Sequence, residues 1–370
     1  MWTEDAVRQI IGKVLAQKDQ IGASFPHVAY DGKFRYENPP FWTAGFWPGI
    51  LWMVYEKTGD ESVKEIAIQI EEQLKDVLDD FFHIHHDVGF MYLPTAVLHH
   101  RLFSNEDSYR TGLKAASHLA GRFNLAGHFI RAWTSEVNPN STGWAIIDCL
   151  MNLPLLFWAS KELKDPRFYQ IAKAHIETVR TKFVREDGTV PHIVSFDPYT
   201  GEKIENLGGQ GYSGDSVWSR GQSWALYGFS IAYRETRDPE YLKAAETIGN
   251  WIWEHLPEDL VPYWDFSAPK EQQFARDSSA AACMASGYLE LSSLEDDQEK
   301  KQKYQNMTEQ ILQSLLEHYA DFSLENQGIL QKGTVSFPND RHINVPIIYG
   351  DYFLLEALMK LTEPEFVRIF

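Results

Sequence analysis

Hydrophobic and polar positions follow a pattern that recurs six times along the chain. Each unit has an apolar helix, an acidic turn and a helix that alternates apolar and charged faces, as surface helices do. The Asp or Glu of each turn is expected to cap the next helix, and in three turns Pro takes its first position. The turns are Gly59-Asp60-Glu61, Asn105-Glu106-Asp107, Asp165-Pro166-Arg167, Asp238-Pro239-Glu240, Asp296-Asp297 and Glu363-Pro364-Glu365.

Six such helical hairpins predict a ring of inner helices inside a ring of outer helices, formed by residues 1–370 as one domain. An open solenoid has the same local pattern. The inner helices are hydrophobic on all sides, which is typical of buried helices and favours the closed ring. A helix from Glu4 to about Lys18 is expected to be the outer neighbour of the first inner helix.

The stretch Trp144–Ala159 is apolar except at Asp148 and Asn152, and we expect it to form one buried helix. The two polar residues stand four apart and would share a face of that helix. A buried carboxylate is costly unless it is paired, hydrogen-bonded or neutral. Asp148 is therefore either satisfied by backbone amides or a neighbouring Arg, or it is a catalytic acid.

Polar or aromatic residues open the first helix of each pair, and in a closed barrel these openings gather at one end. We expect the functional site there. A long connection, roughly Val184 to Ser219, contains a turn at Asp197–Gly201 between two short strands. It also matches GxGxxG at Gly209, but no strand–helix–strand context supports a dinucleotide site. Long loops in compact domains are usually functional, so we expect this one to wall the pocket.

Charge and cysteine content narrow the class of protein. The formal net charge is 34 − 52 = −18, which argues against nucleic acid or an anionic membrane as partner but not against a small anionic substrate. Cys149 and Cys283 lie in apolar runs and are expected to be free thiols in a reducing compartment. With no visible signal peptide and no apolar run long enough to span a membrane, we expect a cytoplasmic protein.

Two aspartates open adjacent inner helices and suggest acid–base chemistry. Asp87 follows His83-Ile84-His85-His86, and its placement resembles that of Asp148. Two carboxylates on neighbouring helices form a natural pair for glycoside chemistry. A metal site is weakly indicated, because ligands this close in sequence rarely complete a tetrahedron and no second His/Cys cluster exists.

Aromatic and basic residues near the helix starts are candidates for sugar binding. Trp42, Trp133 and Trp224 lie near predicted helix starts or loops, where several rings around one mouth suit sugar stacking, although a single Trp is more often part of a core. Arg220 either grips a substrate carboxylate through two hydrogen bonds or forms an ion pair that fixes a loop.

Several motifs together resemble the unsaturated glucuronyl hydrolases of glycoside hydrolase family 88 over nearly the whole chain. They are His86-Asp87-Val88-Gly89-Phe90, Ile146-Ile147-Asp148-Cys149-Leu150, Trp218-Ser219-Arg220-Gly221-Gln222-Ser223-Trp224 and Tyr349-Gly350-Asp351-Tyr352. The resemblance implies an (α/α)6 barrel without a metal or organic cofactor. It also implies substrates made by polysaccharide lyases, which are oligosaccharides that end in a 4,5-unsaturated uronic acid.

The resemblance further implies a role for each matching residue. Asp148 would protonate C4 of the enol-ether double bond and then take a proton from water that attacks C5, which requires a carboxyl that holds a proton near neutral pH. Asp87 would stabilise the developing oxocarbenium charge. The sugar or its carboxylate would be bound by His86, His192, Gln210, Arg220, Trp42, Trp133 and Trp224.

The segment 331–342 is where we expect contacts to the aglycone. Its Lys332, Arg341 and His342 either bind sulfate or belong to a solvated loop. The alternatives to a glucuronyl hydrolase are a rhamnogalacturonan-directed hydrolase with the same chemistry, a sugar epimerase or isomerase with paired His bases, and a non-catalytic helical scaffold.

Overall fold

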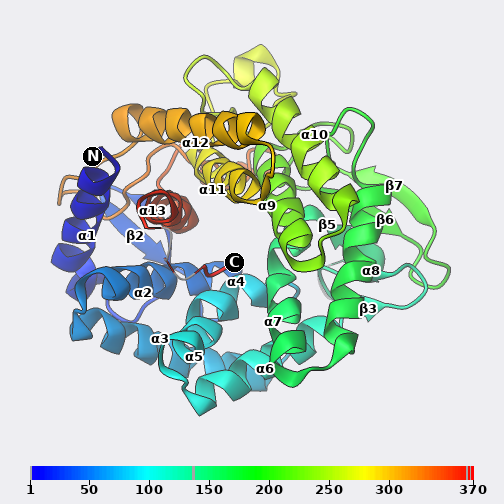
Figure 1. The fold of residues 1–370 in the computed structure, drawn as a ribbon, viewed down its shortest axis with the longest axis horizontal. Helices are drawn as coiled ribbons and strands as arrows, with labels where there is room; N and C mark the ends of the chain where they lie inside the picture. Colours follow the sequence, from blue (N-terminus) through cyan, green and yellow to red (C-terminus); the bar gives the residue numbers. More distant parts are fainter. Residues whose placement is uncertain (1, 136–137, 364–365, 367) are drawn as a thin grey trace.

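The computed structural model describes residues 2–135, 138–363, 366 and 368–370, and Figure 1 shows two concentric rings of helices. The outer helices are α1 (Trp2–Ile21), α3 (Glu61–Asp80), α6 (Glu106–Ala120), α8 (Pro166–Lys182), α10 (Pro239–His255) and α12 (Gln298–His318). The inner helices are α2 (Phe46–Thr58), α4 (Val88–Tyr92) with its continuation α5 (Leu98–Phe103), α7 (Pro154–Leu163), α9 (Ser219–Thr236), α11 (Ser278–Leu294) and α13 (Ile348–Thr362). The predicted (α/α)6 barrel is confirmed.

The predicted turns cap the outer helices. The side chains of Asp60, Asn105, Asp165, Asp238 and Asp297 each accept a backbone N–H of the helix that follows, which satisfies amides that have no partner within the helix. In the second turn the cap is Asn105, not an acidic residue. Pro364 and Glu365 of the expected sixth turn lie outside the described residues.

The N-terminal helix has a different neighbour from the one predicted. It packs chiefly against α13, the last inner helix, and only weakly against α2. Lys13 Nζ donates to the carbonyl oxygens of Asp321 at 2.6 Å and Gly328 at 3.0 Å, which anchors α1 to the segment between α12 and α13. Among the described residues no outer helix follows α13, so α1 occupies that place and closes the ring.

The stretch 144–159 is not one helix. It forms strand β5 (Trp144–Ile146), a 3-10 segment η4 (Ile147–Asn152) and then α7. Strand β5 pairs with β6, with Ala145 opposite Val194. Pro154 has no N–H to donate to a preceding turn, which is tolerated at the first position of an α-helix, and α7 begins at this proline. In the second unit Pro94 lies in a π-helical turn, η2 (Leu93–Val97), which joins α4 to α5.

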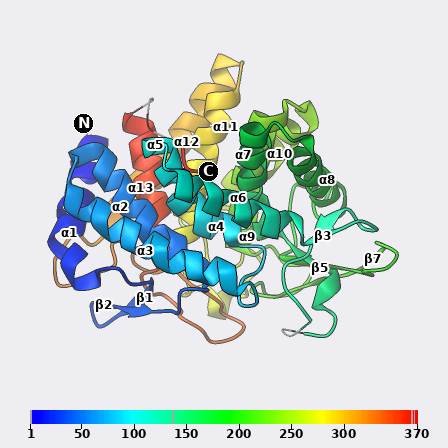
Figure 2. The ribbon, with the colours of Figure 1, turned by 90° about the horizontal axis from the view of Figure 1, so that it is seen from below.

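Short sheets and loops gather at one end of the barrel, the lower side in Figure 2. The long connection contributes β6 (Ile193–Phe196) and β7 (Lys203–Leu207) around the predicted turn, where Gly201 has φ +77°. With β5 they form a three-stranded antiparallel sheet. Unpredicted pairs are β1 (Pro26–Tyr30) with β2 (Lys33–Tyr36) and β3 (Phe123–Asn124) with β4 (Phe129–Ile130). Short 3-10 turns are η1 (Trp42–Gly45), η3 (Ser141–Gly143) and η5 (Lys270–Gln272).

One continuous hydrophobic core extends from Ala6 to Phe370. Cys149 and Cys283 are buried in it as free thiols. Among the described residues, no helix combines the length and apolar character that crossing a bilayer requires.

Candidate active site

Contacts join the starts of the inner helices at one end of the barrel, where the sequence predicted that they would gather. Each inner helix directs its positive N-terminal end toward this region, which favours an anionic ligand in spite of the net charge of −18. The links run from Trp42 to Tyr349, Tyr349 to Arg220, Arg220 to Gln210, Gln210 to His192, His192 to Asp148 and, through Asn152, from Asp148 to Asp87.

Asn152 holds the two aspartates in a fixed relation. It is fully buried, and its Nδ2 donates to Asp87 Oδ1 at 3.1 Å and to the backbone oxygen of Asp148 at 3.2 Å. Its Oδ1 accepts from the backbone N–H of Phe90 at 2.8 Å. All polar atoms of the amide are therefore used. Gly89 makes this approach possible, since a Cβ there would lie 2.4 Å from the Cα of Asn152.

The surroundings of Asp87 keep it ionised. Asp87 is buried at the start of α4, and burial raises the pKa of its carboxyl. The adjacent imidazoles of His86 and His85 and the hydrogen bond from Asn152 outweigh burial and lower the pKa to about 2. His85 Nδ1 lies 3.2 Å from Oδ2, and His86 Nε2 lies 3.5 Å from Oδ1.

His86 is neutral at physiological pH. It is fully buried, and desolvation lowers its pKa to about 4. Neither of its ring nitrogens has a hydrogen-bond partner among the described residues. Buried polar groups are normally paired, so His86 has one donor and one acceptor available for a ligand or water.

Asp148 faces His192 across the mouth. His192 Nε2 lies 3.5 Å from Asp148 Oδ1, and neither atom has a hydrogen-bond partner within the described part of the chain. His192 Nδ1 accepts from the backbone N–H of Gln210 at 2.9 Å. A neutral His192 therefore carries its proton on Nε2, on the side of Asp148. Asp148 lies in the 3-10 segment η4, where its carboxylate is buried but still has a free oxygen.

Arg220 is engaged with protein groups. Its Nη1 donates to Asp277 Oδ2 at 2.6 Å and to the backbone oxygen of Thr334 at 2.7 Å. Its Nη2 donates to Gln210 Oε1 at 2.6 Å and to the backbone oxygen of Val335 at 2.8 Å. Of the two interpretations made from the sequence, the geometry matches the ion pair that fixes a loop.

The three candidate tryptophans differ in exposure. Trp42 is half-buried and packs against Tyr349, with ring centroids 5.0 Å apart. Trp133 is half-buried and stands edge-on to His86. Trp224 contradicts the expectation of an exposed stacking ring: it has 0% exposure and packs in the core against Phe90 and Phe353. It lies one turn into α9, on the face that packs inward.

The sequence analysis assigned no role to several residues that shape the site. Tyr349 and Trp218 both lie against the guanidinium of Arg220, at 5.3 Å and 4.5 Å. Tyr349 is fully buried, and burial raises the pKa of its hydroxyl. Trp218 and Tyr349 each begin one of the family motifs named in the sequence analysis, and this position was the sequence feature that could have identified them. Asp277, the N-cap residue of α11, is the partner of Arg220.

The segment 331–342 lies over the site and is tied to it by Arg220. Of its three candidate sulfate ligands, Lys332 and Arg341 are exposed. His342 Nδ1 is 2.9 Å from the hydroxyl of Tyr30, and Lys332 Nζ lies 5.5 Å from the ring centre of Tyr319. Sulfate binding here remains a prediction.

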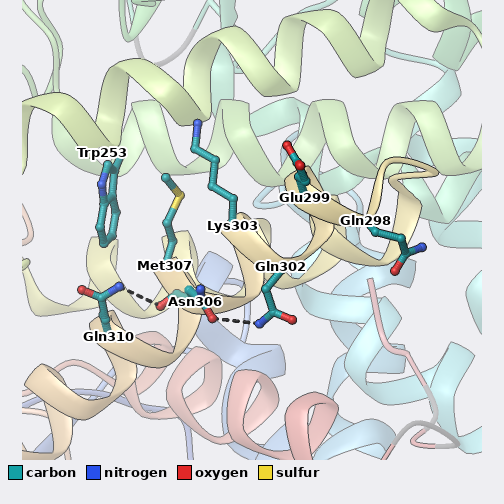
Figure 3. Close-up of a pocket in the computed structure, with 8 residues that line it drawn as sticks. All are labelled: Trp253, Gln298, Glu299, Gln302, Lys303, Asn306, Met307 and Gln310. Carbon is teal, nitrogen blue, oxygen red and sulfur yellow. Dashed lines mark hydrogen bonds between the residues drawn. The ribbon is translucent and has the colours of Figure 1, made fainter.

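Two cavities help to locate the chemistry. One of about 470 Å³ opens beside His85 and Phe41, at the end that carries both aspartates. A larger groove of about 700 Å³, shown in Figure 3, lies between α10 and α12. Its polar groups pair with each other or with neighbours, as in the hydrogen bonds from Gln302 to Asn306 and from Lys303 to Asn250. That groove has no acid–base pair.

One group in the described part of the chain could hold a metal ion. His85, His86 and Asp87 each offer a ligand atom, and these atoms lie within 4.8 Å of one another. A structural zinc site needs four such ligands. The carboxylate of Asp87 also already accepts a hydrogen bond from Asn152.

Comparison with known proteins identifies the family. The model of Glycosyl Hydrolase Family 88 matches residues 14–235. The chain is 35% identical over 366 residues to the unsaturated glucuronyl hydrolase of Bacillus sp. (strain GL1), covering 98% of this chain and 97% of the relative, whose crystal structure matches with a TM-score of 0.94. It is 34% identical to the unsaturated chondroitin disaccharide hydrolase of Streptococcus pyogenes serotype M1, over 94% of this chain and 88% of the relative. A solved unsaturated glucuronyl hydrolase specific for heparin matches with 31% identity and a TM-score of 0.91, over 100% and 99% of the two chains. The chain belongs to glycosyl hydrolase family 88.

Proposed function

We propose that this hydrolase removes the 4,5-unsaturated uronic acid from the non-reducing end of glycosaminoglycan-type oligosaccharides. The observation that carries the proposal is the pair of buried aspartates joined by Asn152 at the barrel mouth. The relatives described above act on unsaturated glucuronyl or chondroitin disaccharide substrates. None of them is a rhamnogalacturonan-directed hydrolase or an epimerase, so nothing favours those alternatives.

In the proposed mechanism Asp148 is the acid and then the base. It donates its proton to C4 of the double bond, and positive charge develops at C5 and the ring oxygen. Water adds to C5 and returns a proton to Asp148. The resulting C5 hemiketal opens to a ketone as the bond between C5 and the ring oxygen breaks, which leaves a hemiacetal at C1. This hemiacetal then loses the aglycone as an alcohol and leaves an open-chain keto acid with an aldehyde at C1. Asp87, which is ionised at neutral pH, stabilises the intermediate charge.

The other site residues bind the sugar. His192 presents Nε2–H toward Asp148 and can donate to the substrate carboxylate or to the attacking water. His86 offers two unpaired nitrogens beside Asp87. Trp42 and Trp133 offer half-buried rings for stacking. Gln210 binds the sugar through its side-chain amide. Arg220 orients that amide by donating a hydrogen bond to its oxygen.

Loss of ultraviolet absorbance tests the reaction. The conjugated double bond absorbs, and hydration of C4 and C5 removes the signal. Wild type should abolish the absorbance of unsaturated chondroitin, hyaluronan or heparin disaccharides, and Asp148→Asn should not. Asp60→Asn is the matched control, because Asn can also cap α3 and the residue lies on an outer turn.

Isotope incorporation separates hydration from direct hydrolysis. In D2O the proposed route places one deuterium at C4 of the product, which NMR detects. Cleavage of the glycosidic bond with the double bond intact, or activity on saturated glucuronides alone, would contradict the mechanism. An unchanged absorbance with all the disaccharides would contradict the substrate class.

The substrate chemistry also places the enzyme in a sequence of reactions. Only β-elimination creates a 4,5-unsaturated uronic acid, so a polysaccharide lyase must act first. We place the enzyme in the cytoplasm, which the two free thiols support. Cell fractionation tests the location, and recovery in an extracellular fraction would exclude it.

A further inference from the structure

A basic groove lies outside the catalytic site, between α3, α6 and the segment 131–134. A cavity of about 230 Å³ is lined in part by Arg122, Arg131, His118 and the rings of Phe81 and Phe82. A neighbouring cavity of about 670 Å³ shares Phe81 and His118 and is also lined by Arg110 and Lys114, which form ion pairs with Asp107 and Asp79, each at 2.9 Å. Two arginines, Arg122 and Arg131, thus line the smaller cavity in a chain whose net charge is −18.

The guanidinium of Arg122 is a buried charge without a carboxylate. It is 5% exposed, and it donates through Nε to the backbone oxygen of Arg131 at 3.1 Å and through Nη2 to that of Ala132 at 2.8 Å. No described carboxylate forms an ion pair with either arginine. Burial, and then the charge of Arg131, lower the pKa of Arg122 to about 10. Buried charges are normally paired, so an anion would complete this arrangement.

His118 supplies a second, independent sign of a ligand. It is 8% exposed and lines both cavities, yet neither ring nitrogen has a hydrogen-bond partner among the described residues. Burial, and then Arg122, lower its pKa to about 4, so the neutral ring offers one donor and one acceptor. Buried side-chain polar atoms without partners are uncommon, and each indicates a missing water, ion or ligand.

Aromatic rings at the groove indicate that the ligand has an apolar face. Phe81 and Phe82 are 58% and 68% exposed and stand edge-to-face, and Phe81 lies edge-on to His118 at 5.1 Å. Phe81 also has φ +67°, a conformation that bulky residues rarely adopt. Strained residues concentrate at ligand-binding sites. Exposed rings beside cations suit a sugar that carries a carboxylate or a sulfate.

We propose that this groove is a second, non-catalytic binding site for an acidic saccharide. Arg122, Arg131 and His118 would hold the carboxylate or sulfate, and Phe81 and Phe82 would pack against the sugar. The site is connected to the catalytic one, because the backbone oxygen of Ala132 accepts from both Arg122 Nη2 and the backbone N–H of His86. The saccharide class rests on the proposed function, whereas the anion site rests on the groove alone.

Calorimetry with a ligand that the enzyme cannot turn over tests the proposal. The probe is a saturated chondroitin sulfate tetrasaccharide, which has no C4–C5 double bond. Wild type should bind it, and Arg131→Gln should weaken binding at least ten-fold and reduce its salt dependence. Arg8→Gln, which removes an exposed charge from α1, is the matched control and should bind as wild type does. Both variants should hydrolyse an unsulfated unsaturated disaccharide at the wild-type rate.

Two further arms decide the site and the ligand class. Phe82→Ser should weaken binding of the tetrasaccharide but not of inorganic sulfate. Binding should persist in Asp148→Asn protein whose catalytic site is filled with unsaturated disaccharide; displacement would place the ligand in the catalytic site and overturn the proposal. Absent binding, equal binding by Arg131→Gln, or binding of sulfate and phosphate without the saccharide would also overturn it. Failure of the hydration assay alone would overturn the proposed function and leave the anion site standing.

Discussion

A single methyl group at Gly89 should separate the two aspartates. Alanine there would place its Cβ 2.4 Å from the Cα of Asn152 and 2.6 Å from its Oδ1. Ordinary contact begins at 3.4 Å, so the start of α4 and the segment η4 must move apart by about 3.4 − 2.4 = 1.0 Å. Because Asp87 and Asp148 lie on these two elements, their spacing must change with them.

Gly89→Ala has two opposing effects on stability: alanine favours the helix, and its methyl group clashes with Asn152. A Gly→Ala change within a helix stabilises by about 0.5–1 kcal/mol where space is free. Overpacking costs about 1–3 kcal/mol, and here the clash is with backbone. A displacement of about 1 Å at a catalytic group costs roughly 10²-fold in rate. Gly89→Ala should therefore be less stable than wild type and about 100-fold less active.

Gly12→Ala is the matched control, since a Cβ at Gly12 meets nothing within 4 Å. It lies inside α1 and should stabilise the protein without any effect on activity. Chemical unfolding and the absorbance assay measure both variants. A folded Gly89→Ala enzyme with wild-type kcat/KM would show that this contact does not set the geometry of the aspartate pair.

Three other perturbations follow from the site and the core. Asn152→Leu removes the hydrogen-bond partners of the Phe90 N–H and of one oxygen of Asp87, which should lower the free energy of unfolding by about 2–5 kcal/mol. The variant should also reduce kcat with little change in KM. A raised KM with normal kcat would assign Asn152 to substrate binding. Trp224→Phe should leave KM unchanged because the ring is buried. An increase in KM would show that Trp224 contributes to substrate binding. Burial, and then the imidazole of His86, lower the pKa of His175 to about 3, so between pH 6.5 and 4 only the unfolded state takes up the proton and the protein loses stability as the pH is lowered. In urea unfolding at several pH values, His175→Gln should reduce the dependence of stability on pH by about 1.4 kcal/mol per pH unit in this range. An unchanged dependence would refute the assignment.

Local signals in the sequence were sufficient for most of the helices and for the position of the two buried aspartates at one end of the barrel. Acidic turns and apolar runs predicted five of the six hairpins, because caps and amphipathic faces are local properties. Asp148 stood out because a carboxylate in an apolar run must be satisfied or used. The positions of Asp87 and Asp148 at one end followed from the closure of the ring.

Properties that depend on distant partners were not predictable in the same way. The strand conformation of 144–146 depends on pairing with β6, about fifty residues later. Arg220 could be read as a substrate ligand because its partner Asp277 lies 57 residues away. The neighbour of α1 is α13, near the opposite end of the chain. The burial of Trp224 depends on which face of α9 packs inward.

The charges in the site indicate where a uronate carboxylate would bind. Arg220 is neutralised by Asp277, so its guanidinium does not offer a free positive charge to a substrate carboxylate. Attraction for an anion must therefore come from hydrogen-bond donors and from the N-terminal ends of the inner helices. Those donors, His192 Nε2–H and the amide of Gln210, lie on the side of Asp148. We infer that the carboxylate binds there, away from Asp87, which leaves Asp87 beside the ring atoms where positive charge develops.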